Sequence, residues 1–188
     1  MESETIALLK TRRSVKPADM TGPGPSTAEV ETLLTIASRV PDHGKLAPWR
    51  FIVFEGEARA RAAAVIAHGY MTKYPDATPE QANEAGQRFL LAPLVIAVVS
   101  RAAPHVKIPE WEQVMSAGAS VMNLLTAAHA LGYAACWLSE WFAYDRTVLD
   151  ALGLTPHEKI AGFVHIGRAK EPPEDRPRPA LAEIVRSF

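Results

Sequence analysis

The segment APLVIAVVS, residues 92–100, constrains the fold of this chain more than any other stretch. It carries no charged side chain, and its apolar run is too continuous for a strand that has one face in water. Such a strand belongs in the interior of a sheet, which other segments of the chain must complete. We therefore expect residues 92–100 to form an interior strand.

Three further segments have the composition of strands. They are WRFIVFEG at 49–56, YAACWLSEWF at 133–142, where the strand runs into a loop, and KIAGFVHIGRA at 159–169. Together with the interior strand they predict a sheet of about four main strands. Helical segments are interspersed with them, so the expected class is mixed α/β or α+β.

Apolar residues at helical spacing predict the remaining elements. Helices are expected at 4–10, 27–40, 57–71 and 145–154, and residues 78–91 are compatible with another. The longest helix should cover 108–132, with Gly132 as its stop and with an apolar face of Val114, Ala117, Val121, Leu124, Leu125 and Ala128. Residues 17–26 and 41–48 should be loops, and the proline-rich stretch 171–179 should precede a closing segment, 180–188. No linker interrupts the chain before that stretch, so we expect one domain over residues 1–188.

The charge balance and the single cysteine argue against several classes of function. Lys and Arg number 20 and Asp and Glu 21, so no bulk affinity for nucleic acid or for an anionic membrane is expected. Cys136 has no second cysteine with which to form a disulfide or a metal site, and its apolar surroundings predict a buried, inert thiol with a raised pKa. The six histidines include no HxxxH pair, so we expect no metal. Without a signal peptide or a membrane-spanning run, a cytoplasmic protein is expected.

The stretch TRRSVK, residues 11–16, has two interpretations. Cations are favourable at the C-terminal end of a helix, where they face unpaired carbonyl groups. Arginine guanidinium groups and a serine hydroxyl also suit the oxygens of a phosphate. On this stretch alone the helix-end interpretation is favoured, because short basic runs are usually solvated surface. His129, alone within the longest helix, is expected to be a structural residue.

Polar and aromatic residues also gather where other predicted elements end, which is where sites are commonly built. Arg39 and His43 follow the second helix; Trp137, Leu138 and Ser139 end a strand; and Arg168 lies near the end of another. Singly, each has a structural explanation as a helix-end cation, a turn residue or a core aromatic. Together with Arg12, Arg13 and Ser14 they suit a phosphate and a flat heterocycle, which predicts a phosphorylated aromatic cofactor.

Three segments resemble, in order, the motifs of the nitroreductase family of FMN-dependent oxidoreductases: RRSVK at 12–16, ASRVPDHGKLAPWRFIVFEG at 37–56 and SAGASVMNLLTAAHALGYAACWLS at 116–139. The PDHxxxxPW form of the loop, with WEQVMSAGA, resembles a small, YdjA-like branch of that family. The resemblance implies an α+β, nitroreductase-like fold, with a central, mostly antiparallel sheet surrounded by helices. It also implies a homodimer with FMN at the subunit interface.

The resemblance further implies roles for individual residues. Arg12, Arg13 and Ser14 would bind the phosphate and ribityl end of FMN; Arg39 and His43 would reach the flavin from the partner subunit; Trp137, Leu138 and Ser139 would lie against its ring; and Arg168 is a looser match to a further phosphate-binding cation. Lys16 stands where the motif has Arg, which keeps the charge and loses the bidentate geometry. His43 and Ala47 also depart from the pattern of larger members, so the substrate range can differ.

The implied function is that of an NAD(P)H-dependent oxidoreductase with ping-pong kinetics. NADH or NADPH would reduce FMN, and a small electron-poor acceptor, such as a nitroaromatic or a quinone, would then take the electrons. No side chain is expected to be catalytic, because the chemistry belongs to the cofactor. Three alternatives stay open: a flavin-binding carrier or sensor, a nitroreductase-fold enzyme with a different FMN chemistry, and a domain without flavin in which TRRSVK only ends a helix.

Overall fold

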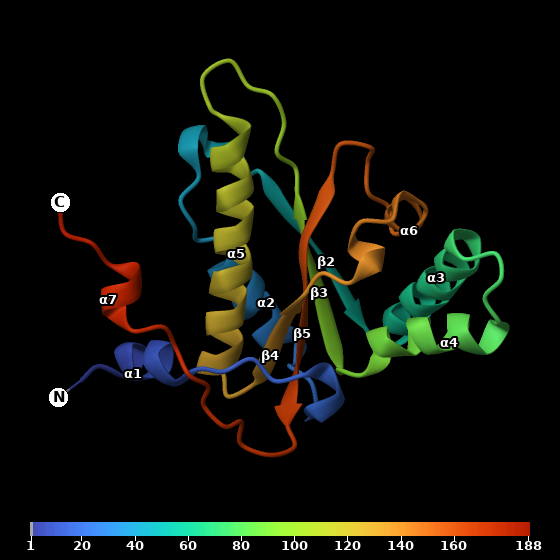
Figure 1. Cartoon of the computed structure of the whole chain (residues 1–188), viewed down its shortest axis with the longest axis horizontal. Coiled ribbons are helices and arrows are strands. Elements are labelled where there is room, and N and C mark those ends of the chain that lie inside the picture. Colours follow the sequence, from blue (N-terminus) through green and yellow to red (C-terminus); the bar gives the residue numbers. More distant parts are fainter. Residues whose placement is uncertain (1) are drawn as a thin grey trace.

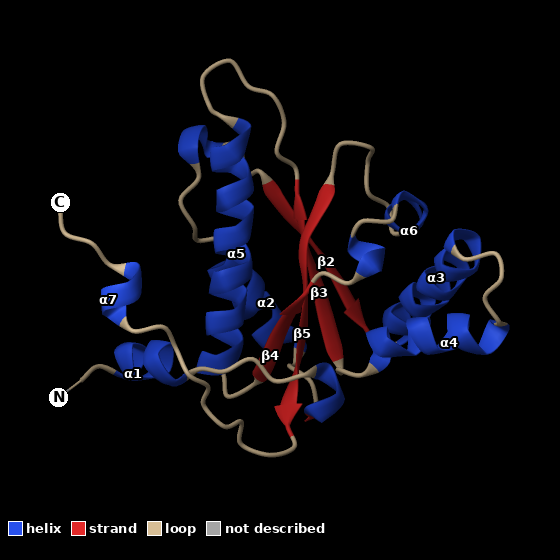
Figure 2. Ribbon diagram, in the orientation of Figure 1, coloured by secondary structure: helices blue, strands red, loops and turns tan. Residues whose placement is uncertain are grey.

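The computed structural model describes residues 2–188 and is built on a five-stranded sheet (Figure 1). Its four longer strands are β2 (Trp49–Glu55), β3 (Leu94–Ser100), β4 (Ala134–Leu138) and β5 (Lys159–Ala169). Strand β3 lies between β2 and β5, β4 also pairs with β5, and all of these pairings are antiparallel (Figure 2). Every residue of β3 is buried, which confirms the interior position expected from its apolar run.

Helices cover both faces of the sheet, which explains why β3 has no polar face. Helices α2 (Thr27–Ala37) and α5 (Glu110–Ala130) lie on one face, and α3 (Glu57–Lys73), α4 (Pro79–Gln87) and α6 (Arg146–Ala151) lie on the other (Figure 1). Alternate residues of β3 enter the two cores: Ile96 packs with residues of α2 and α5, and Ala97 packs with residues of α3 and α6. The α+β class and the mostly antiparallel sheet are therefore confirmed.

Helix α5 is the longest helix, as expected, and Gly132 follows its end with a φ of 78°. A positive φ is easily adopted only by glycine, so Gly132 stops the helix as predicted. The expected core face is wrong at Val114, which is 41% exposed. The buried face of α5 includes Gln113 and Ala117. Val114 follows Gln113 by one residue, so its side chain is rotated by about 100° around the helix axis from that of Gln113.

One strand was not expected from the sequence. Residues 17–26 were predicted to be a loop, but Pro17–Asp19 form a 3₁₀ turn and Met20–Thr21 form β1, which pairs with Ala169 and Arg168 at the end of β5. A strand of two residues is too short to show alternation, so its sequence could not reveal it. The buried Met20 side chain fixes it against a small apolar cluster that includes Cys136.

The two ends of the described chain lie on the side of α5 that faces away from the sheet (Figure 1). Helix α1 (Glu4–Thr11) is at one end, and α7 (Leu181–Ile184) is the only helical part of the closing segment. Helix α2 ends at Ala37, three residues before the predicted end, with Ser38 as its cap. Among residues 2–188, no helix is both long enough and apolar enough to cross a membrane.

Candidate functional site

The segment Arg12–Ser14 lies beside β4. Helix α1 ends at Thr11, and the chain continues in an extended conformation from Arg12. Ser14 forms a parallel bridge with Ala135, and the N–H of Val15 donates to the carbonyl oxygen of Ala135 at 3.3 Å. The basic run predicted from the sequence is therefore held against the outer edge of the strand whose end carries the predicted aromatic group.

Arg12 has an unsatisfied buried donor. Its Nη1 atom is buried and has no hydrogen-bond partner in the described part of the chain. A buried polar group without a partner costs about 1–3 kcal/mol, and more when the group is charged. An anion that accepts from this nitrogen would remove that cost, so Arg12 has the environment of an anion-binding residue.

Arg13 contacts the proline-rich stretch 171–179 and helix α5. Its Nε donates to the carbonyl oxygen of Glu174 at 2.9 Å and lies 3.8 Å from Oδ1 of Asp175. Its own carbonyl oxygen lies 2.7 Å from Nε2 of His129, near the end of α5. His129 was expected to be a structural residue without a functional role, and nothing in its local sequence pattern indicates this long-range contact.

The end of β4 presents an indole ring. Trp137 is 42% exposed, and its Nε1 donates to the carbonyl oxygen of Ala161 at 3.0 Å. A Cβ at Gly162 would overlap this ring, so the missing side chain at Gly162 makes room for it. Leu138 is half-buried and Ser139 is exposed. Trp137 lies two residues after Ala135, the bridge partner of Ser14, which is about 7 Å along the strand. The fold therefore brings the basic segment and the end of β4 together.

The loop between α2 and β2 is pinned to α5 by polar side chains. Asn123 Nδ2 donates to the carbonyl oxygens of Arg39 and Ile36 at 2.9 and 3.1 Å. Ser116 Oγ donates to the carbonyl oxygen of Pro41 at 2.6 Å, and it accepts from the indole N–H of Trp49 at 3.1 Å.

The same loop carries His43, whose Nδ1 lies 2.8 Å from Oε2 of Glu112 at the start of α5. Sequence reasoning missed Glu112, Ser116 and Asn123 as the residues that hold this loop. Their spacing of four and seven residues places them near one side of the helix, and this polar row within an apolar helix is the pattern that indicates such a role.

A single chain does not bring His43 close to the Arg12–Ser14 segment. His43 contacts Glu112, and the carbonyl group of Arg13 contacts His129. Glu112 and His129 are about 25 Å apart along α5, at a rise of 1.5 Å per residue. The two groups lie at opposite ends of α5 (Figure 1). Arg39, whose carbonyl oxygen accepts from Asn123, is exposed.

Arg168 lies near the end of α5 that carries His129. Its guanidinium carbon is 4.4 Å from the centre of the Tyr133 ring, and its Nη1 donates to the carbonyl oxygen of Gly132 at 3.4 Å. The Tyr133 hydroxyl donates to Glu29 at 3.1 Å. Burial, followed by the hydrogen bond to Glu29, raises the pKa of Tyr133, while hydrogen bonds from Ser26 lower the pKa of Glu29. The exposed Arg168 therefore stacks on the neutral ring of the buried Tyr133.

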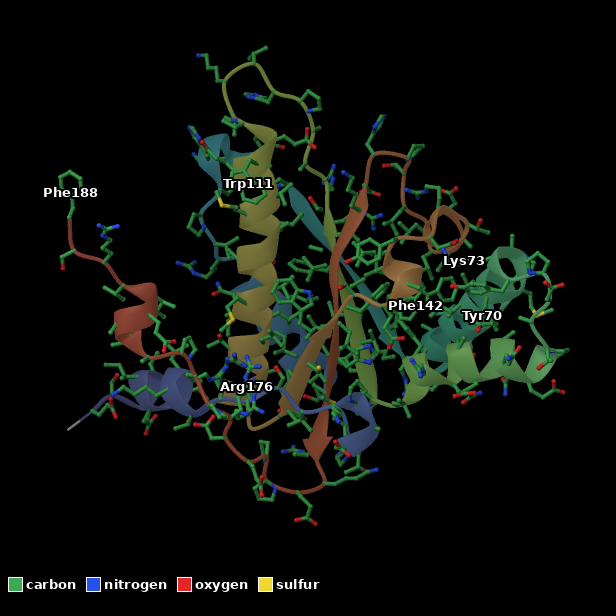
Figure 3. The ribbon with its side chains drawn as sticks, in the orientation of Figure 1. Tyr70, Lys73, Trp111, Phe142, Arg176 and Phe188 are labelled. Atoms are coloured by element: carbon green, nitrogen blue, oxygen red, sulfur yellow. The ribbon has the colours of Figure 1, made fainter. Side chains whose placement is uncertain are left out.

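The outer face of α5 is apolar and exposed. Trp111 is 68% exposed, Met115 49% and Met122 36%. Met115 also lines a cavity of about 290 Å³ with Pro41, His43, Glu112, Ser116 and Ala119. Figure 3 labels Trp111 at the start of α5 and Phe188 at the free end of the closing segment, away from the sheet. Exposed apolar patches of this kind mark surfaces that bind other molecules.

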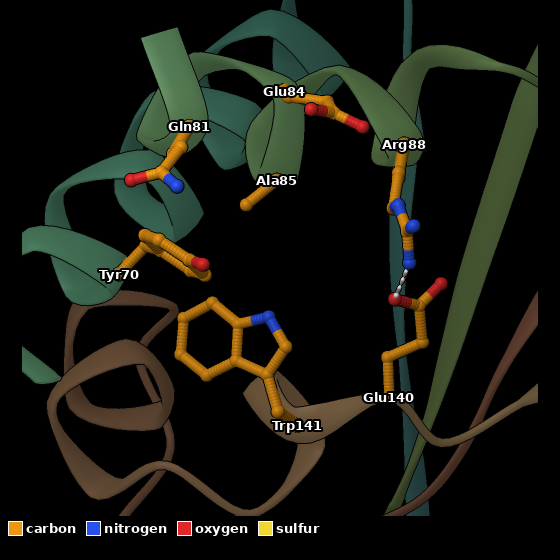
Figure 4. Close-up of a pocket in the computed structure, with 7 residues that line it drawn as sticks. All are labelled: Tyr70, Gln81, Glu84, Ala85, Arg88, Glu140 and Trp141. Atoms are coloured by element: carbon orange, nitrogen blue, oxygen red, sulfur yellow. Dashed lines mark hydrogen bonds and ion pairs between the residues drawn. The ribbon is translucent and has the colours of Figure 1, made fainter. Parts of the chain in front are cut away.

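A second cavity, of about 260 Å³, lies on the other face of the sheet (Figure 4). It is lined by Tyr70, Gln81, Glu84, Ala85, Arg88, Glu140 and Trp141. Arg88 Nη1 and Glu140 Oε2 are 3.3 Å apart. The rings of Tyr70 and Trp141 pack edge to face, with their centres 5.7 Å apart. Helices α3 and α4 form much of its wall, so it is separate from the Arg12–Ser14 segment.

Cys136 is buried, and burial raises the pKa of its thiol, as predicted. Within residues 2–188, no group of three or more His, Cys, Asp or Glu side chains has the geometry to hold a metal ion.

Comparison with known proteins gives one consistent family. The model of the nitroreductase family matches residues 9–168. An Escherichia coli K12 protein with the provisional name NAD(P)H nitroreductase YdjA is 36% identical over 164 residues, which are 87% of each chain. A nitroreductase-like protein from Bacillus cereus has the same fold, with a TM-score of 0.85 and 24% identity over 100% of this chain and 97% of that one.

A provisionally named nitroreductase from Desulfovibrio desulfuricans, solved in complex with FMN, aligns with a TM-score of 0.75 and 25% identity over 100% of this chain and 98% of that one. The family match spans both the Arg12–Ser14 segment and the end of β4. The resemblance found in the sequence, including that to the YdjA-like branch, is thus confirmed. The chain belongs to the nitroreductase family.

Proposed function

We propose that this protein is an FMN-dependent NAD(P)H oxidoreductase that reduces electron-poor acceptors, such as nitroaromatics or quinones, by a ping-pong mechanism. The observation that carries the proposal is the buried, unpartnered Nη1 of Arg12 at the edge of β4. The names of the relatives support it, since the YdjA name includes NAD(P)H and the Desulfovibrio desulfuricans structure contains FMN. The proposal treats residues 1–188 as one FMN-binding domain.

The phosphate end of FMN fits the Arg12–Ser14 segment. Arg12 offers the buried N–H groups that lack an acceptor, and Ser14 is exposed beside it with a free choice of hydroxyl direction. Arg13 adds positive charge, although its Nε already donates to Glu174. Arg168, stacked on Tyr133 at the same end of α5, is a secondary candidate because its guanidinium would have to turn towards the phosphate.

The flavin ring fits the end of β4. Trp137 and Leu138 offer apolar surface, and the chain leaves the sheet after Leu138, so the backbone groups of Ser139 are free to bind a heterocycle edge. The indole of Trp137 is fixed by its hydrogen bond to Ala161, which gives a rigid contact surface. The proposal assigns Trp137, Leu138 and Ser139 to this contact.

We further propose that two copies of the chain complete each site. His43 has no part of the Arg12–Ser14 segment within reach at its end of α5, whereas a two-fold related copy with an antiparallel α5 would carry it towards that segment, together with Arg39 of the same loop. The exposed apolar face of Trp111, Met115 and Met122 offers the surface that such a dimer would bury. The homodimer therefore accounts for the split arrangement of the predicted residues.

When bound, FMN would supply the redox chemistry, accepting a hydride from NADH or NADPH and giving the electrons to the acceptor in a second half-reaction. The chain's own groups bind and orient. Arg12 and Arg13 provide the charge that holds a phosphate, and the strand end fixes the plane of an aromatic ring. None of these side chains transfers a proton in this account.

The test of the site is FMN affinity, measured by fluorescence titration of the purified protein. Arg12→Ala should weaken FMN binding by at least about tenfold, since hydrogen bonds to charged groups contribute about 1.5–3 kcal/mol. Arg61→Ala, at an exposed position of α3, is the matched control and should bind like the unaltered protein. Undiminished affinity in Arg12→Ala refutes the phosphate assignment.

A further inference from the structure

The ring of His129 makes two short polar contacts that no other histidine in residues 2–188 makes. Its Nδ1 lies 2.7 Å from the carbonyl oxygen of Leu125, one turn earlier in α5. Its Nε2 lies 2.7 Å from the carbonyl oxygen of Arg13, which is 116 residues away in sequence. The ring therefore connects the last turn of α5 to the basic segment.

Both of these partners can only accept a hydrogen bond. A neutral imidazole has one N–H, and its other nitrogen is an acceptor, so a neutral ring would leave a lone pair facing a carbonyl oxygen. The imidazolium form has two N–H groups and satisfies both contacts. The last turn of a helix also favours a cation, because its carbonyl groups are unpaired.

The charged groups around this contact are mostly cationic. Arg12 and Arg13 lie on the segment that His129 holds, and Arg168 stacks on Tyr133 just beyond the helix end. Asp175 faces Arg13, and Glu29 faces Tyr133 and Arg168. An anion bound at Arg12 would offset this excess of positive charge. Anion binding and the charge on His129 should therefore favour each other, because linkage between two sites is reciprocal.

We propose that His129 is a positioning residue: as an imidazolium it holds the Arg13 carbonyl, and with it the Arg12–Ser14 segment, where that segment binds the phosphate of FMN. The inference rests on the proposed function, which supplies the phosphate. Loss of the second ring proton removes one of the two contacts, so the affinity for FMN falls at pH values at which the ring is neutral.

The charge state of the ring is testable without any cofactor. Nitrogen NMR of the whole protein with ¹⁵N-labelled histidine, at pH 7, should show both ring nitrogens of His129 as protonated nitrogens. The His129→Gln variant identifies the signals by their disappearance. A bare ring nitrogen at His129 overturns the proposal, whatever the protein binds.

The positioning role is tested by comparing FMN with riboflavin, which lacks the phosphate, in titrations from pH 6 to pH 9. Both donors of a Gln side chain are on one nitrogen and cannot reach the two carbonyl oxygens that face different ring nitrogens of His129. His129→Gln should therefore weaken FMN binding about tenfold at pH 7 and leave riboflavin binding unchanged. FMN affinity of the unaltered protein should fall towards that of His129→Gln as the pH rises. His68→Gln, at an exposed position of α3, should behave as the unaltered protein does.

Three outcomes separate the possibilities. Equal FMN affinity in His129→Gln and the unaltered protein, at every pH, overturns the positioning role while the flavin site stands. An equal loss of FMN and riboflavin also overturns it, since the residue then only supports the fold. If no variant binds either flavin, the proposed function fails and the phosphate role fails with it, while the NMR result still decides the charge of the ring.

Discussion

At the level of single residues, His165 is the most unusual group in the core. It is 1% exposed, and neither ring nitrogen has a hydrogen-bond partner within residues 2–188. Its ring meets Phe89 edge to face at 5.9 Å, on the α3 side of the sheet. Burial lowers the pKa of His165 from 6.5 to about 4, so the ring is neutral in the folded protein at neutral pH.

This lowered pKa predicts a loss of stability in mild acid. Below pH 6.5 the unfolded chain takes up a proton at His165 that the folded chain refuses until the pH approaches 4. The free energy of unfolding should therefore fall by about 2 kcal/mol between pH 7 and pH 5 because of this residue. His165→Leu should remove that part of the fall, as measured by urea unfolding at the two pH values. His157→Gln, an exposed control, should retain it; an unchanged pH dependence in His165→Leu would show that burial of His165 is not its cause.

Residues of the candidate site could be predicted from the sequence only where they belong to a motif. Arg12, Ser14 and Trp137 stand in segments that resemble a known pattern, and the fold brings those segments together. Glu112 and His129 were missed because their contacts join positions 69 and 116 residues apart, and no local pattern encodes such pairs. Val114 was misplaced because an apolar side chain at the border of a helix face suits either the core or an interface.

At the level of elements, one ion pair joins β2 to the turn before β5. Nε and Nη2 of Arg50 donate to the two carboxylate oxygens of Glu158 at 2.6 and 2.8 Å, and the N–H of Thr155 donates at 2.9 Å. The Arg50 hydrogen bonds are the main cause that lowers the pKa of Glu158 to about 2. The Glu158 side chain is only 9% exposed, so water screens this pair less than it screens a surface pair.

Glu158→Gln should lower the free energy of unfolding by about 2 kcal/mol at pH 7, because it removes a charged partner from Arg50. The stabilisation by the carboxylate is complete above pH 4.5 and is lost as the pH falls towards 2. The loss in free energy of unfolding caused by Glu158→Gln, relative to the unaltered protein, should thus be about 1 kcal/mol smaller at pH 4 than at pH 7. Chemical denaturation at both pH values measures it, with the exposed Glu55→Gln as control; a deficit that is the same at both pH values argues against the ionic origin.

The elements themselves were largely predictable, for physical reasons that differ among them. β3 was recognisable because burial on both faces demands an uninterrupted apolar run, and the end of α5 was recognisable because Gly132 permits a positive φ. β1 was not, since a strand of two residues shows no alternation and is defined only by its pairing with β5. The early end of α2 depends on Ser38, whose hydroxyl donates back to the carbonyl oxygen of Thr35.

At the level of the whole molecule, the proposed dimer makes a prediction about the outer face of α5. The double change Met115→Glu and Met122→Glu would bury two unpaired carboxylates in the interface, at a cost of several kcal/mol. We expect it to weaken the dimer at least about 100-fold and to weaken FMN binding with it, because each site would lose the residues of the partner. Light scattering after size exclusion should give twice the 20.4 kDa of one chain for the unaltered protein and a single chain for the variant.

Tyr144→Glu provides the control, because Tyr144 is also an exposed large side chain, at 71%, but lies outside the α5 face. It should leave both the mass and the FMN affinity unchanged. An unaltered protein that is monomeric at micromolar concentration yet binds FMN fully would contradict the shared site.

The central claim, that this chain is an NAD(P)H-dependent flavin oxidoreductase, is tested most directly by one anaerobic absorption experiment on the FMN-loaded protein. NADH or NADPH is added first and a quinone or nitroaromatic second. We predict that the bands of oxidised flavin bleach with at least one of the two nucleotides and return when the acceptor is added. Bands that persist with both nucleotides would contradict the claim and favour a flavin carrier or a different flavin chemistry.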